Sequence, residues 1–168
     1  MDVSELLIES FGRIPDLVSA AVDGLSADDL ARPPAEGANT IGWLTWHLTR
    51  VQDHHVSDLL DEEQVWIGGD WAPRFGLDPD PDETGYGHSA AEVLRVRPDG
   101  PDAVTGYLDA VWDRVRHYLE GLHPDDLDDV VDESWDPPVT RGVRLVSVVD
   151  DCAQHAGQAA YARGLLGL

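Results

Sequence analysis

Apolar residues recur every three or four positions along four long segments of this 168-residue chain. The segments run from Ser4 to Asp23, Thr40 to Leu60, Pro101 to Leu122 and Val143 to Leu166. This spacing places the apolar side chains on one face of an α-helix. The two-residue alternation of strands occurs only between Asp129 and Trp135, a stretch too short to change the fold class. The sequence therefore predicts an all-α four-helix bundle.

The connection between the second and third predicted helices, Ile67 to Pro101, is long and rich in Gly, Pro and Asp. Ser89 opens a capping-box pattern with Glu92, which predicts a short helix through Arg95. Disordered segments are poor in aromatic residues, so the aromatic side chains here indicate order; they are Trp66, Trp71, Phe75 and Tyr86. We expect this crossover to fold over one end of the helices, within one domain spanning residues 1–168.

The charge of the chain excludes several classes of function. The formal net charge is −22, and all 11 basic residues are arginine. The lack of lysine removes Schiff-base chemistry, and the acidity argues against binding to nucleic acids or anionic membranes. The first residues do not resemble a signal peptide, no segment is apolar enough to span a membrane, and Cys152 is the single cysteine. These features predict a soluble cytoplasmic protein.

Asp151 and His155 lie four residues apart in the last predicted helix, and this spacing brings two side chains to one helix face. His47, in the second predicted helix, can supply a third ligand from a neighbouring helix. Three protein ligands with one open position are typical of catalytic zinc sites, and the same set suits nickel, manganese or iron. The alternative is a core histidine at position 47 and a surface ion pair at positions 151 and 155.

Two motifs resemble the DinB superfamily. They are Thr40-Ile-Gly-Trp-Leu-Thr-Trp-His47-Leu and Asp151-Cys-Ala-Gln-His155-Ala-Gly-Gln158. More narrowly, the chain is similar to the actinobacterial branch that includes mycothiol-dependent maleylpyruvate isomerase and mycothiol S-transferases. The resemblance implies a four-helix bundle, commonly a homodimer, that binds a divalent metal through His47, Asp151 and His155. Many members carry His or Glu where this chain has Asp151, so metal geometry and preference are open to change.

Three further residues are candidates for contact with a substrate. Arg50 lies about one turn from His47, where it can bind a substrate carboxylate or form a salt bridge with an acidic residue. His54 shares the helix face of His47 and either contacts a substrate or lies at the surface. Gln158 orients a metal ligand, contacts substrate or is exposed. Gly157, inside a helix, indicates that another helix backbone approaches closely there, while Cys152 is predicted to be a packed, inert thiol.

These residues support three hypotheses of function. In the first, a low-molecular-weight thiol such as mycothiol binds a zinc ion at the open position and attacks a small electrophile. In the second, the same metal activates water for hydrolysis. In the third, the protein is a stress-related or ligand-binding bundle without catalytic activity. Iron-dependent oxygen chemistry uses a similar ligand set, but the bundle and the resemblance do not favour it.

Overall fold

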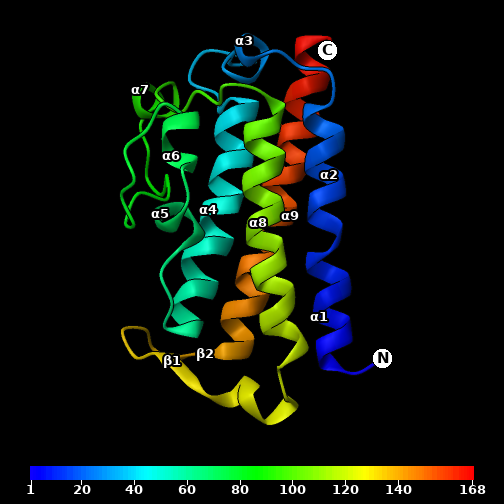
Figure 1. Ribbon diagram of the computed structural model, residues 1–168, viewed down its shortest axis with the longest axis vertical. Coiled ribbons are helices and arrows are strands. Elements are labelled where there is room, and N and C mark those ends of the chain that lie inside the picture. Colours follow the sequence, from blue (N-terminus) through cyan, green and yellow to red (C-terminus); the bar gives the residue numbers. More distant parts are fainter.

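The computed structural model describes residues 1–168 and confirms the all-α bundle (Figure 1). Its long helices are α4 (Ile41–Leu60), α8 (Pro101–Glu120) and α9 (Arg141–Leu166), and a fourth position is filled by α1 (Val3–Phe11) followed by α2 (Arg13–Val22). Short helices are α3 (Ala27–Leu30), α5 (Val65–Gly68), α6 (Trp71–Arg74) and α7 (Ala90–Val93). α4 packs against α9 and α8, and their facing apolar stripes form the core. None of the helices combines the length and apolarity needed to cross a membrane.

The first predicted helix is divided in two at Gly12. Pro15 follows three residues later and has no N–H to bond the carbonyl of Phe11, so a continuous helix would lose a hydrogen bond and create a clash there. A Cβ on Gly12 would lie 2.8 Å from the Ile8 carbonyl oxygen and 3.3 Å from the Trp112 ring. The break therefore has a local cause in proline, and glycine allows α8 to pack closely beside it.

Threonine side chains fix the start of both helices that carry the predicted metal ligands. Thr40 Oγ1 accepts a hydrogen bond from the Trp43 amide at 3.0 Å, and Thr140 Oγ1 accepts one from Val143 at 3.4 Å. These contacts satisfy amides that have no partner within the first turn. The predicted cap at Ser89 also forms, as the capping box of α7.

The stretch between α8 and α9 differs from the prediction. A 3-10 helix (Pro124–Asp128) leads into β1 (Val130–Asp132), which pairs antiparallel with β2 (Val139–Thr140). The alternation that begins at Asp129 is therefore a real strand, stabilised by a partner that the sequence pattern did not reveal. This hairpin lies below the lower ends of α4 and α9 (Figure 1) and carries the exposed Trp135 in its turn.

The crossover between α4 and α8 lies along the side of α4 and not over one end of the bundle as predicted (Figure 1). Two buried residues of α4 hold it there. The carboxylate of Asp53 accepts hydrogen bonds from the amides of Val65 and Trp66 at 2.9 and 2.7 Å. Arg50 donates to the carbonyl oxygens of Pro81 and Glu83, both at 3.0 Å. The beginning and the middle of the crossover are thus attached to one helix turn.

Candidate metal centre

His47 on α4 and Asp151 and His155 on α9 converge in the structure, as the spacing predicted. One possible ligand atom from each residue lies within 4.8 Å of the other two. His155 Nε2 is 3.5 Å from Asp151 Oδ1, and the imidazole centroids of His47 and His155 are 4.8 Å apart. His47 is buried, whereas Asp151 and His155 are partly exposed. The three side chains can therefore surround one small cation while one side of it faces solvent.

Both histidines point the same ring nitrogen towards the centre. His47 Nδ1 bonds the Thr84 carbonyl oxygen at 2.5 Å, and His155 Nδ1 bonds Gln158 Oε1 at 2.8 Å. Because both partners are acceptors, each Nδ1 carries the proton and each Nε2 offers its lone pair to the centre. Metal-ligating histidines are commonly oriented by such a second hydrogen bond. Gln158 therefore takes the orienting role, one of the alternatives that the sequence left open.

The Asp151 carboxylate gives the sharpest test of whether a cation fits. Its Oδ2 is buried and has no hydrogen-bond partner. A buried carboxylate oxygen without a partner loses its hydration without gaining a hydrogen bond in return. A metal ion bonded to the carboxylate would compensate for that loss. The donor set of two imidazole nitrogens and one carboxylate matches the ligands that zinc and related divalent metals bind. The residues present fit a divalent metal.

The pKa shifts of His47 and Asp151 favour metal binding near neutral pH, whereas the shift of His155 opposes it. Burial lowers the pKa of His47, which keeps the imidazole neutral. Burial alone would raise the pKa of Asp151, but the hydrogen bond from His155 and nearby imidazolium charge outweigh it, so the pKa is lowered. The hydrogen bond to Asp151 raises the pKa of His155. A metal must therefore displace one proton, from His155.

Residues 83–88 of the crossover complete the surroundings of His47. Trp43 stacks on the His47 ring with centroids 4.7 Å apart and donates through Nε1 to His88 Nδ1 at 3.1 Å. His88 Nε2 lies 2.8 Å from Glu83 Oε1. Gly85 has φ of +90°, and a Cβ there would lie 2.8 Å from the Trp46 ring and 3.1 Å from His47 Nδ1. Sequence reasoning missed Glu83, Gly85 and His88 because these crossover residues share no helical spacing with His47.

Several sequence-based assignments change at this point. The side chain of Arg50 is fully buried and is not available to bind a substrate. Its guanidinium bonds Asp53 at 3.4 Å, Tyr107 at 3.2 Å and Gln64 at 2.8 Å. The salt-bridge alternative is the one the structure supports. Gly157 is exposed, and an added Cβ would meet nothing within 4 Å. The predicted close approach of another helix of the same chain is therefore wrong.

Cys152 is fully buried, and burial raises the pKa of its thiol. Its Sγ points to the Leu48 carbonyl oxygen at 3.3 Å. The prediction of a packed thiol is confirmed, and its lack of reactivity stays a prediction.

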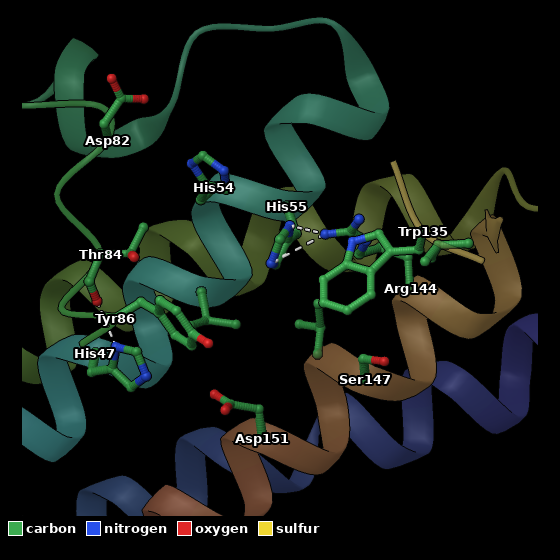
Figure 2. Close-up of a pocket in the computed structure, with 13 residues that line it drawn as sticks. His47, His54, His55, Asp82, Thr84, Tyr86, Trp135, Arg144, Ser147 and Asp151 are labelled. Carbon is green, nitrogen blue, oxygen red and sulfur yellow. Dashed lines mark hydrogen bonds between the residues drawn. The ribbon is translucent and has the colours of Figure 1, made fainter. Parts of the chain in front are cut away.

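A cavity of about 520 Å³ opens beside two of the predicted ligands, His47 and Asp151 (Figure 2). His47 and Asp151 lie at one end, and His55, Arg144 and Trp135 lie at the other (Figure 2). His54 also lines the cavity, where its Nδ1 accepts a hydrogen bond from Gln64 Nε2 at 3.2 Å. Its predicted contact with substrate stays a prediction. Arg144 and Trp135 were missed, because only the hairpin and the packing of α4 on α9 bring them to the cavity.

Comparisons with known proteins bear on the fold and the family of the chain. The chain is similar over its whole length to a conserved protein from Enterococcus faecalis whose crystal structure is solved. The two share 34% sequence identity with a TM-score of 0.91, over 100% of this chain and 99% of that chain. No curated protein matches the chain. The narrower resemblance to the mycothiol-dependent branch stays a prediction. The model of the DinB superfamily, which is metal-binding, matches residues 10–159, and the chain therefore belongs to the DinB superfamily.

Proposed function

We propose that this protein is a metal-dependent transferase or isomerase, in which a low-molecular-weight thiol is activated at the site of His47, Asp151 and His155 and attacks a small electrophile. The observation that carries this proposal is a set of three ligands beside an accessible cavity of about 520 Å³. Structural zinc sites are closed by four protein ligands, whereas catalytic sites keep a position for an outside group. The cavity provides room for that group and for its reaction partner.

A bound divalent metal lowers the pKa of a coordinated thiol, so that the reactive thiolate exists at neutral pH. The residues of the chain prepare the site for it. Thr84 and Gln158 hold the two imidazoles with Nε2 towards the centre, and Asp151 supplies the anionic ligand. Cys152 cannot replace the outside thiol as nucleophile, because its Sγ is buried and directed at a backbone carbonyl.

Zinc is the proposed metal, since His47, Asp151 and His155 would hold it with two imidazoles and one carboxylate, and zinc also binds sulfur; nickel, manganese and iron accept similar ligands. Mycothiol is the proposed thiol on the resemblance of the two motifs to the mycothiol-dependent branch. A cytoplasmic location, where thiols are kept reduced, fits this chemistry.

The test combines metal analysis with a transfer assay. The zinc-loaded protein is mixed with monochlorobimane and, in turn, mycothiol, glutathione or cysteine, and formation of the fluorescent thioether is followed. We expect turnover that depends on the thiol, is lost in His155→Ala and is retained in Cys152→Ala.

Other outcomes point to the remaining hypotheses. Hydrolysis of an activated ester without any thiol would favour a metal-dependent hydrolase. A protein that binds one zinc per chain but turns over none of these mixtures would favour a binding protein without catalytic activity. An inactive Cys152→Ala variant with full zinc content would show that the nucleophile is Cys152.

A further inference from the structure

The cavity has three layers, because the two helices that line it present residues at matching intervals. On α4 these are His47, Val51 and His55; on α9 they are Asp151, Val148 and Arg144. Each step is three or four residues, close to one helical turn of about 5.4 Å. The cavity therefore has a metal-binding layer, an apolar middle layer and a third layer that contains Arg144, about 10 Å along α9 from Asp151.

Two exposed aromatic side chains border the apolar middle of the cavity. Tyr86 comes from the crossover and is 93% exposed, and Trp135 comes from the hairpin turn and is 66% exposed. Each ring offers a large apolar area for contact with a ligand in the cavity. Their positions on different walls (Figure 2) favour a ligand with an apolar body that lies between them.

The third layer holds the cavity's one arginine in a chain with a net charge of −22. Arg144 Nη2 donates to Asp132 Oδ2 at 2.9 Å, and Nη1 donates to His55 Nδ1 at 2.8 Å. These two contacts fix the guanidinium and leave three of its five N–H donors unused. The Nε2 of the same imidazole also lies 3.4 Å from Arg144 Nη1, so the donors left for a ligand are those of Arg144.

We propose that the Arg144 and His55 end of the cavity binds a carboxylate, so that the substrate is an elongated small organic acid with its reacting group at the metal end and an apolar body between Val51 and Val148. The assignment rests on the proposed function for the role of the metal end. Asp132 already compensates part of the Arg144 charge, which favours a singly charged carboxylate over a doubly charged phosphate. The free N–H donors of Arg144 can meet its two oxygens.

The first experiment tests the carboxylate site without any metal. Hexanoate, hexanol and hexylphosphonate are titrated separately into the metal-free protein, and NMR shifts give each dissociation constant. We expect hexanoate to bind roughly tenfold more tightly than hexanol, as for a hydrogen bond to a charged group. Equal binding of hexanoate and hexanol would overturn the proposal, and so would binding of hexylphosphonate alone.

Two variants with opposite expected effects separate binding from structure. Arg144→Gln should remove the preference for hexanoate over hexanol. Asp132→Asn should strengthen hexanoate binding several-fold, because the guanidinium loses its competing anion. Arg13→Gln is the control, since it makes the same charge change at an exposed position on α2 and should alter nothing. If Asp132→Asn instead weakens hexanoate binding, Arg144 serves only the structure and the proposal is wrong.

The second experiment links this site to the metal end. Calorimetry compares 6-mercaptohexanoate with 6-mercaptohexanol on the zinc-loaded protein, and we expect the acid to bind more tightly in the wild type but not in Arg144→Gln. If zinc binds and both thiols bind equally, the carboxylate assignment fails while the proposed function stands. If zinc does not bind, the proposed function fails, and the titration with hexanoate still decides the carboxylate site.

Discussion

The contact between Asp151 and His155 involves only one of the two carboxylate oxygens of Asp151. Oδ1 lies 3.5 Å from His155 Nε2, whereas Oδ2 of the same group is buried without a partner. A proton shared with His155 therefore satisfies only one oxygen, and a divalent cation between the two side chains and His47 satisfies the site better. This asymmetry indicates a metal site and not a surface ion pair.

Replacement of the metal ligands should remove the metal. We expect one zinc per chain in the wild type, none in His155→Ala, and greatly weakened binding in Asp151→Asn, which keeps the shape of the side chain but removes the anionic ligand. Elemental analysis after dialysis against a mild chelator measures this. His117→Ala, an exposed histidine on α8, is the control and should bind zinc as the wild type does. Equal zinc content in all four proteins would contradict the ligand assignment.

Loss of the hydrogen bond to His155 should weaken the metal site without removing a ligand. Gln158→Leu leaves Nδ1 of His155 without its acceptor, so the imidazole is free to rotate or change tautomer. We expect zinc affinity to fall by about 10–100-fold, the range found for such orienting partners. Gln154→Leu is the matched control, because Gln154 bonds Asp150 on the exposed side of α9. Competition with a chromophoric chelator gives both affinities, and identical values would rule out the orienting role.

The attachment of the crossover to α4 should contribute strongly to stability. Asp53 is fully buried and accepts hydrogen bonds from Tyr107 at 2.7 Å as well as from two crossover amides. Asp53→Ala leaves the two amides and the Tyr107 hydroxyl without their acceptor and removes the carboxylate that pairs with Arg50. We therefore expect a loss of about 3–5 kcal/mol in the free energy of unfolding. Urea denaturation measures it. Asp58→Ala, exposed on the same helix, should change stability by less than about 0.5 kcal/mol.

His55 should make the metal-free protein less stable in mild acid. Burial, followed by the charge of Arg144, lowers its pKa from 6.5 to about 4. Between these two values the unfolded chain binds the proton and the folded chain does not, so stability falls as the pH falls from about 6.5 towards 4. In His55→Gln this decline should be shallower than in the wild type or in His117→Gln. Urea denaturation at several pH values tests this, and parallel curves for all three proteins would exclude the assignment.

The exposed side of α9 is a candidate for the homodimer interface that the resemblance implies. Tyr161 and Leu165 are 70% and 57% exposed, and Gly157 and Gly164 have open space where a Cβ would lie. These residues recur at three- or four-residue spacing, so a second copy of the chain can approach this face closely. We expect a dimer mass by light scattering in the wild type and in Leu94→Glu, but a monomer mass in Tyr161→Glu. A monomeric wild type would contradict the prediction.

The sequence by itself determined the helices and the three candidate ligands. Helical periodicity and the i, i+4 spacing of Asp151 and His155 are local properties, as are the caps at Thr40 and Thr140. His47 could be identified as the third candidate ligand because it lies in a motif of its own.

Only the tertiary structure decided which other side chains belong to the site. Thr84 meets His47 through a turn of the crossover, and Arg144 meets His55 because α9 packs on α4. The position of Arg50 on its helix suggested that it could bind a substrate, yet the crossover buries its side chain completely. Contacts between distant segments follow from how the chain closes its core, and no periodicity within one segment encodes them. The chemistry of the far end of the cavity therefore came from the fold alone.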